Sequence, residues 1–197
     1  QRFVSDVSHE LRTPLTTIRM ASQVIFATRD SFEPTVARSA ELLISQIERF
    51  ESLLTDLLEV SRFDAQAAVL EIKEIDLVAL VRETIDYVHP SQDRIINLQT
   101  SSAEILADVD PRRIKRIIRN LVSNAIDHRE GKDIDIRIAE TENEVSIGVR
   151  DYGSGFNFTD RKMLFERFWR ADSSRARSTG GTGLGLSIAL EDAKLHQ

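Results

Sequence analysis

The stretch Ser8-His9-Glu10-Leu11-Arg12-Thr13-Pro14-Leu15 lies within a run of apolar residues that repeat at alternating steps of three and four. This spacing predicts a helix with a narrow apolar seam, and it returns after a turn-rich segment at residues 28–34. Because two helices alone would bury such a seam poorly, residues 1–63 are expected to form an antiparallel hairpin that dimerises into a four-helix bundle. The alternative is a hairpin packed against the rest of its own chain. The seam positions are Val4, Val7, Leu11, Ile18, Ala21 and Ile25, then Ala40, Leu43, Ile47, Phe50, Leu54 and Leu57.

Composition limits the class of protein. At 197 residues and 41% hydrophobic content, one large or two small domains with a packed core are expected, and no membrane span. The 26 basic and 32 acidic residues give a formal net charge of −6, which argues against general nucleic-acid binding. Cysteine is absent, so disulfides and thiolate metal sites are excluded. The sequence begins inside a helical pattern without a signal peptide, so we expect a piece of a longer protein whose membrane segment would lie upstream.

Beyond a short linker at residues 64–68, helical and strand patterns are mixed. Asp110 followed by Pro111 is an N-cap with proline at the first helical position, and it predicts a helix to about Asp127. Apolar residues alternate in two runs within 134–149, which predicts a hairpin with one buried face. The order of elements predicts an α/β sandwich, a mixed sheet with helices on one face. The other predicted elements are a helix over 77–88 capped by Asp76, strands over 95–98 and 105–109, a short helix over 161–168 and a last helix from about Gly183.

Three stretches of the second half have the chemistry of a nucleotide site. Asn120 and Asn124 are four residues apart on one helix, so their amides point the same way, and amide oxygens suit Mg²⁺. Asp151 enters the turn Gly153-Ser154-Gly155, where a carboxylate can accept from an exocyclic amine such as that of adenine. Gly181-Thr182-Gly183-Leu184-Gly185 opens a helix whose N–H groups favour phosphate, although no P-loop lysine follows. Taken singly, the asparagine pair is more often a surface feature and the Asp151 stretch more often a plain turn, whereas the last stretch is equally well a flexible loop.

His9 falls at an outward position of the first predicted helix, beside Glu10. An imidazole can attack a γ-phosphorus through Nε2 if its Nδ1–H is held and a carboxylate accepts its proton, a role that fits Glu10. Pro14 removes a backbone hydrogen bond and should bend the helix near this pair. Without the nucleotide features, the stretch would describe an exposed His-Glu pair on a solvated helix. With them, His9 is the candidate phosphoacceptor.

In this order, the stretches resemble the N box (Asn120–Asn124), G1 box (Asp151–Gly155), F box (Leu164–Arg170) and G2 box (Gly181–Gly185) of the GHKL or Bergerat ATP-binding fold, which histidine kinases share with gyrase-type topoisomerases. Residues 8–15 resemble the H box of bacterial sensor histidine kinases. The resemblance covers essentially the whole chain. It implies a dimerisation and histidine phosphotransfer hairpin at 1–63, a linker at 64–68, and a catalytic ATP-binding domain at 69–197 whose fold continues past the last residue.

The resemblance also implies that the segment between the two glycine boxes is a mobile lid over ATP. Phe165 and Phe168 would anchor the base of this lid in the core, and Arg170 would reach the phosphates. Many sensor kinases carry a Lys-Tyr pair shortly after the N box, where this chain has Asp127 and His128. A basic phosphate contact is therefore lost, and His128 or Arg129 is left to replace it. More narrowly, residues 3–9, 124–128 and 191–197 resemble the MtrB-type kinases of actinobacteria.

The activity implied is ATP-dependent autophosphorylation of His9 in a homodimer, followed by phosphoryl transfer to an aspartate of an MtrA-like response regulator receiver domain. Glu10 would act as base, and Thr13 resembles the residue that positions water in a regulator phosphatase. The cofactors implied are ATP and Mg²⁺, with the ion held by Asn124 and by Asn120 nearby. The implied nucleotide-site residues are Asn120, Asn124, His128, Arg129, Asp151, Gly153, Gly155, Phe165, Phe168, Arg170, Gly181, Thr182, Gly183, Leu184 and Gly185.

Two other functions stay open at this point. A GHKL-type ATPase would hydrolyse ATP without a phosphohistidine, although the H box and the hairpin disfavour it. A catalytically inactive dimer scaffold is disfavoured by the intact glycine boxes. The implied location is the cytoplasmic portion of a plasma-membrane sensor, with the membrane contacted only through absent upstream segments.

Overall fold

The computed structural model describes residues 2–65, 68–89, 95–155, 157–170 and 182–196, and it leaves the side chains of residues 2–10, 12 and 158–160 undescribed. Its contacts divide the chain into two units, Gln1–Ala68 and Val69–Gln197. No helix within the described ranges is both long and apolar enough to cross a bilayer.

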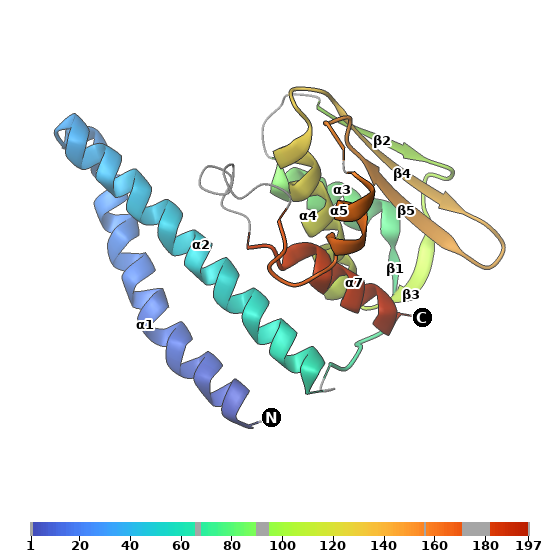
Figure 1. Cartoon of the computed structure of the whole chain (residues 1–197), viewed down its shortest axis with the longest axis horizontal. Coiled ribbons are helices and arrows are strands. Elements are labelled where there is room, and N and C mark those ends of the chain that lie inside the picture. Colours follow the sequence, from blue (N-terminus) through green and yellow to red (C-terminus); the bar gives the residue numbers. More distant parts are fainter. Residues whose placement is uncertain (1, 66–67, 90–94, 156, 171–181, 197) are drawn as a thin grey trace. The chain divides into compact units, whose positions relative to one another are not determined.

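The first unit is a helical hairpin, as predicted. Helix α1 spans Arg2–Ala27 and helix α2 spans Pro34–Asp64, with a short 3-10 helix, η1, at Arg29–Ser31 between them. The two helices run antiparallel in Figure 1. Pro34 occupies the first turn of α2, where its missing N–H costs nothing. Pro14 lies inside α1 without ending it.

The predicted seam is split into two stripes in this hairpin. One stripe is buried where the two helices meet: it includes Ala40 and Ile47 of the predicted seam, together with Leu15, which was not among the predicted positions. The other stripe, which we name the exposed seam, is open to solvent: Ile18 is 51% exposed and Phe50 is 52% exposed. Because large apolar side chains favour burial, this stripe leaves an unmet hydrophobic driving force. The exposed seam consists of Leu11, Ile18, Ile25, Leu43, Phe50 and Leu57.

The second unit contains the predicted mixed sheet. Strand β2 (Ile96–Thr100) pairs in parallel with β4 (Ile134–Glu140), which pairs antiparallel with β5 (Val145–Arg150). Figure 1 shows the helices gathered on one face of this sheet. The layered α/β sandwich expected from the order of elements is confirmed. The helices are α3 (Leu77–Val88), α4 (Pro111–His128), α5 (Phe158–Met163) and α7 (Gly185–Leu195), and a separate antiparallel pair joins β1 (Lys73–Asp76) to β3 (Leu106–Val109).

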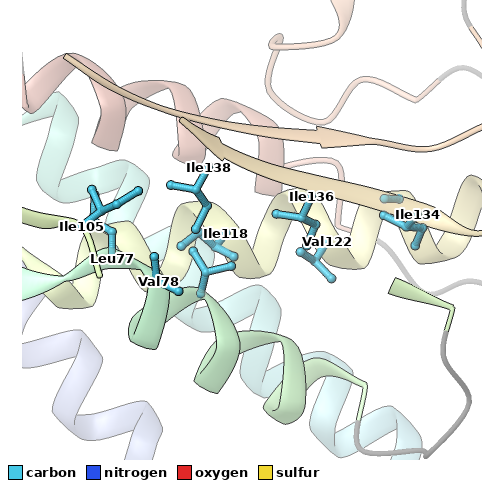
Figure 2. Packing of buried hydrophobic residues seen from close by; sticks show 10 residues of the cluster. Leu77, Val78, Ile105, Ile118, Val122, Ile134, Ile136 and Ile138 are labelled. Atoms are coloured by element: carbon cyan, nitrogen blue, oxygen red, sulfur yellow. The ribbon is translucent and has the colours of Figure 1, made fainter. Parts of the chain in front are cut away.

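The core lies between the sheet and helices α3 and α4. Figure 2 shows Ile134, Ile136 and Ile138 of β4 on the side of the sheet that faces Ile118 and Val122 of α4. All five of these side chains are fully buried. Alternation along β4 thus matches the helical spacing along α4, so the core fixes where α4 lies on the sheet.

Both predicted aspartate caps are confirmed. Asp76 accepts a hydrogen bond from the Val78 N–H at the start of α3, and Asp110 accepts from the Arg112 and Arg113 N–H groups at the start of α4. Asp110 is fully buried, and burial alone would raise the pKa of its carboxyl. Hydrogen bonds from Glu71, Arg112 and Arg113 outweigh this effect and leave the pKa below its usual value. Asp110 is therefore a charged cap that fixes the origin of α4.

Two details of the prediction were wrong. Strand β1 was missed because it is short and carries Lys73 and Glu74, which are exposed and show no apolar alternation. The short helix expected over 161–168 lies instead at Phe158–Met163. After Met163 the chain turns, with Glu166 N–H donating to the Met163 carbonyl at 2.9 Å.

Candidate functional site

Helix α4 places both predicted asparagines on one side. Asn120 and Asn124 are half-buried. The Nδ2 of Asn120 donates to the Gly185 carbonyl at 2.9 Å, which links α4 to the start of α7. Because a carbonyl only accepts, this contact orients the Asn120 amide with its nitrogen toward Gly185. The oxygen Oδ1 is then the side-chain atom left to receive a cation or water.

The G1 turn is built around Asp151, directly after β5. Asp151 Oδ1 accepts from the Gly153 N–H at 2.9 Å, and Lys132 Nζ donates to the Tyr152 carbonyl at 2.6 Å. Asp151 is half-buried and keeps its second carboxylate oxygen for another donor. Gly155 has a φ of +71°, a conformation that glycine adopts readily. Local bonds therefore hold the carboxylate at one position beside the C-terminal end of α4.

Gly153 approaches the backbone of α4 too closely for any side chain. A Cβ at this position would lie 2.0 Å from the His128 carbonyl oxygen, a contact with rigid backbone. We predict that Gly153→Ala displaces the G1 turn or the end of α4 and weakens ATP binding by about tenfold or more, since overpacking typically costs about 1–3 kcal/mol. Titration with a fluorescent ATP analogue measures the change.

The matched control for this substitution is Gly148→Ala. Gly148 lies on β5, and a Cβ there would meet nothing within 4 Å. Gly148→Ala is expected to bind nucleotide as the unsubstituted chain does. Equal affinity in both variants would show that the close approach of Gly153 to α4 has no role in the site.

The G2 turn leads directly into α7. Thr182 Oγ1 accepts from the Leu184 N–H at 3.1 Å, and Leu184 is fully buried. Gly183 has a φ of +72°, and a Cβ on it would lie 3.0 Å from the backbone of Phe168. These contacts order the turn, and they occupy the Leu184 N–H that was expected to be available to phosphate. Gly181, also predicted to bind nucleotide, lies outside the described residues.

The F box differs from the prediction. Phe165 and Phe168 were expected to anchor the lid in the core, but they are 47% and 61% exposed. The Phe168 backbone makes the anchor instead, because its N–H donates to the Gly183 carbonyl at 2.9 Å. Phe168 has a φ of +64°, a left-handed backbone conformation that a regular right-handed helix does not contain. The resemblance to the F box therefore did not predict that the Phe168 backbone, and not the two rings, makes the contact.

The replacement of the usual Lys-Tyr pair leaves a charged group at the end of α4. Desolvation of its carboxyl raises the pKa of Asp127, and the charges of His128 and Arg170 act in the opposite direction. Arg170, predicted to reach the phosphates, is half-buried and lies within electrostatic range of Asp127. Arg129 caps α4, and its Nη1 donates to the Lys132 carbonyl at 3.1 Å. Two basic side chains, those of His128 and Arg170, thus lie within electrostatic range of Asp127, which replaces the usual lysine.

The H box lies in α1 of the other unit. His9 and Glu10 have helical backbone, but their side chains lie outside the described part of the structure. Thr13 and Pro14 are exposed. Thr17 Oγ1 donates to the Thr13 carbonyl at 3.2 Å, so the backbone next to Pro14 accepts a side-chain hydrogen bond. This part of α1 therefore presents polar groups to solvent.

A magnesium ion bound here would need ligands from the nucleotide. Within the described residues, no three His, Cys, Asp or Glu side chains are grouped closely enough to hold a metal. Mg²⁺ commonly takes one or two protein oxygens and completes its shell with phosphates and water. The Asn120 amide, oriented by Gly185, and the neighbouring Asn124 fit this mode.

Sequence reasoning missed a buried ionic cluster that joins the same two helices. Asp192 of α7 is fully buried against two arginines of α4, Arg113 and Arg116. The sequence did contain a signal, since Arg113 and Arg116 are three residues apart and so share a helix face with Asn120. The partner carboxylate, more than seventy residues away, could not be found from spacing.

Comparison with known families defines the class. The His Kinase A (phospho-acceptor) domain matches residues 1–66, and the histidine kinase-, DNA gyrase B- and HSP90-like ATPase matches residues 109–197. In solved structures the same fold occurs in full-length ShkA in complex with AMPPNP, with a TM-score of 0.77, 24% identity, and coverage of 98% of this chain and 41% of that one. It also occurs in the Acinetobacter baumannii histidine kinase AdeS, with a TM-score of 0.62, 23% identity, and coverage of 95% and 86%.

Within this class, the chain belongs to the sensor histidine kinase family. It is 52% identical over its whole length to sensor histidine kinase MtrB of Mycolicibacterium paratuberculosis, of which it covers 35%. It is 50% identical, again over its whole length, to sensor histidine kinase MtrB of Mycobacterium tuberculosis, covering 35%. Sensor histidine kinase YkoH of Bacillus subtilis is 36% identical and is covered over 43%. The chain thus spans about a third of the length of its MtrB relatives.

Proposed function

We propose that this chain is the kinase core of a two-component sensor, which phosphorylates His9 with ATP and passes the phosphoryl group to an aspartate of a response regulator. The proposal rests on the similarity to sensor histidine kinases over the whole chain. It is supported by the glycine turn at the start of α7, which Asn120 of α4 contacts. The hairpin would be the phosphoacceptor and dimerisation domain, and the second unit would be the ATP-binding domain.

The nucleotide is proposed to lie against α4, the G1 turn and the start of α7. Asp151 would accept from the adenine amine through the carboxylate oxygen that Gly153 does not use. The first-turn N–H groups of α7 and Thr182 would hold the phosphates, aided by the positive end of the helix dipole. Mg²⁺ would be bound by Asn124, with Asn120 nearby, and would neutralise charge on the phosphates. Other proposed contacts are His128, Arg129, Gly155, Phe165, Phe168, Arg170, Gly181, Gly183 and Gly185.

In the proposed reaction, the Nε2 of His9 attacks the γ-phosphorus, the bond to the β-γ bridging oxygen breaks, and ADP leaves. Glu10 would take the imidazole proton, which keeps the nucleophilic lone pair available. Little covalent chemistry is required of the protein, so alignment and electrostatics would supply most of the rate. The linker at residues 64–68 would have to bring the two sites together.

The exposed seam is proposed to pair with that of a second copy in a four-helix bundle. Phe50 lies near its middle and is 52% exposed. We predict that Phe50→Glu converts the dimer to a monomer, because pairing would then bury an unpaired carboxylate. Light scattering after size-exclusion chromatography measures the mass.

Ser52→Glu is the matched control, since Ser52 is exposed and points about 160° away from Phe50 on α2. It should remain dimeric. If Phe50→Glu is dimeric as well, or if the unsubstituted chain is a monomer at micromolar concentration, the seam is not a dimer interface and packing within the chain explains the pattern.

The regulator proposed as partner is a receiver domain of the MtrA kind, in keeping with the MtrB-named relatives. Thr13 is exposed one turn after His9 and is proposed to orient water for dephosphorylation of that regulator. The chain would be the cytoplasmic part of a membrane sensor, and segments outside this sequence would link it to the membrane. Receiver phosphorylation, and the loss of phosphate from a phosphorylated receiver incubated with the chain without nucleotide, can be followed on phosphate-affinity gels.

One labelling experiment separates the three candidate functions. The chain is incubated with γ-labelled ATP and Mg²⁺, and both bound label and released phosphate are measured. Acid-labile, base-stable label on the protein supports the histidine kinase. Phosphate release without bound label supports a GHKL-type ATPase, and neither product supports an inactive scaffold.

A further inference from the structure

Helix α7 carries a carboxylate at a fully buried position. Asp192 is 0% exposed, and it accepts a hydrogen bond from Arg113 Nη1 at 2.7 Å. Arg116 donates to the same carboxylate from Nε at 2.6 Å and from Nη2 at 2.7 Å, which is a two-bond fork. The arginine side chains are 12% and 15% exposed. We name these three residues the Asp192 cluster.

Stability alone does not explain a buried ionic cluster. Removing charges from water is costly, and well-packed apolar residues of similar volume often serve stability equally well. An ionic fork differs from an apolar contact in being directional. Two parallel N–H···O bonds from Arg116 tolerate little sliding or rotation of Asp192, whereas aliphatic side chains can slip against one another. The Asp192 cluster is therefore suited to fixing the register of α7 along α4.

A second contact lies two helical turns away on the same helix pair. Asn120 Nδ2 binds the Gly185 carbonyl at the start of α7, and Asp192 lies two turns further along that helix. On α4 the order is reversed, with Arg113 two turns before Asn120. The helices thus run antiparallel and are joined near both ends of α7. The G2 turn enters α7 beside the Asn120 contact, and Asn124 lies one turn beyond it on α4.

The far end of α7 is held at the origin of α4 as well. The Asp110 N–H donates to His196 Nε2 at 3.1 Å, and His196 Nδ1 lies 2.7 Å from the Asp192 carbonyl. Since Nε2 accepts, Nδ1 must carry the ring proton and donate. Arg113 Nη2 also donates to the Val69 carbonyl at 3.2 Å. The cluster therefore connects α7, α4 and the first residues of the second unit.

We propose that Asp192 is a positioning residue for nucleotide binding and phosphoryl transfer, acting by setting the register of α7 on α4. The register fixes the distance between the G2 turn and Asn124. That distance decides whether the phosphates can contact the G2 turn while the Mg²⁺ bound to them contacts Asn124. This inference rests on the proposed function. A slip of one residue along a helix is about 1.5 Å, and a misplacement of about 1 Å can cost about 10²-fold in rate.

The test uses Asp192→Asn in the full chain, which keeps the shape and removes the charge. ATP-analogue affinity is measured by fluorescence titration, the initial rate of His9 labelling at saturating ATP by filter binding, and the melting temperature by circular dichroism. We expect affinity to fall about tenfold and the rate about 10²-fold at temperatures where the variant is folded. Glu191→Gln is the matched control, because it breaks only the exposed Lys194–Glu191 pair one residue away.

The double variant Asp192→Leu/Arg116→Met separates positioning from stability. Two apolar side chains should return the melting temperature toward that of the unsubstituted chain, because they remove both charges of the Arg116–Asp192 fork together and Arg113 keeps its ion pair with Asp110. The labelling rate should stay low, because the directional fork is gone. If the double variant recovers both melting temperature and rate, the cluster is structural only and the proposal is overturned.

Three further outcomes are decisive. If Asp192→Asn does not fold, Arg116→Lys is tested in its place, because lysine keeps the positive charge but cannot form the two-bond fork. A normal rate of His9 labelling in folded Arg116→Lys overturns the proposal. If the unsubstituted chain binds ATP and labels His9 while Asp192→Asn does so equally well, only this inference fails. If the unsubstituted chain neither binds ATP nor becomes labelled, the proposed function fails and the inference with it.

Discussion

His9→Gln is expected to abolish phosphorylation of the chain while leaving ATP binding intact. Glutamine keeps polar hydrogen bonding at this position in α1 but has no nucleophilic ring nitrogen, so no phosphoramidate can form. The proposed nucleotide site is built entirely from residues of the second unit, and the substitution does not touch it. Label from γ-labelled ATP should fall by about 10³-fold or more, to background. Fluorescence titration with an ATP analogue should give an unchanged dissociation constant.

His89→Gln is the control for this substitution, since it makes the same chemical change after α3 in the other unit. It should label normally. Acid-labile label that survives in His9→Gln would assign the phosphoacceptor to another histidine and remove the central residue of the proposed mechanism.

Asn124→Ala is expected to have the second largest effect, this time on the nucleotide side. The substitution removes the amide oxygen proposed to bind Mg²⁺, one helical turn after the Asn120–Gly185 contact. Without that ligand the ion would be held by phosphates and water alone, and charge on the transferring group would be less well neutralised. Labelling of His9 should fall by about 10²-fold, because removing one electrostatic contact to a transition state costs about that much.

The Mg²⁺ dependence of this variant is the sharper measurement. The half-saturating Mg²⁺ concentration for labelling should rise in Asn124→Ala, whereas a general loss of structure would lower the maximal rate without such a shift. Asn143→Ala, at the exposed turn between β4 and β5, is the matched control. An unchanged Mg²⁺ requirement in Asn124→Ala would show that the asparagine is not a ligand.

Local sequence patterns were sufficient for most elements of the fold. Asp76 and Asp110 mark the starts of α3 and α4 because an aspartate side chain caps free N–H groups whatever the tertiary context. Alternation in β4 predicted its buried face because the isoleucines must all point toward the helices. The F box shows where resemblance to a family fails. Phe165 and Phe168 were expected to anchor the lid in the core because of that resemblance, but both side chains are exposed after the turn at Met163.

The chemical character of the site was likewise readable from single stretches. Asn120 and Asn124 share a side of α4 because of helical periodicity, and the first N–H groups of any helix lack partners within the helix. That the Leu184 N–H is occupied by Thr182 was not readable in this way. The close approach of Gly153 to His128 could not be inferred in this way. It depends on how β5 delivers the G1 turn to the end of α4, which is a property of the folded sheet and helix together.

The sequence by itself determined the two architectures, the helix caps and the residue types able to handle phosphate, because each depends on neighbours within a few positions. Only the tertiary structure decided which half of the hairpin seam remains exposed, and which carbonyl orients Asn120. It alone joined Asp192 to Arg113 and Arg116. Contacts between residues far apart in the chain are set by packing of the whole core, and no local pattern records the distance or direction in which two distant side chains will meet.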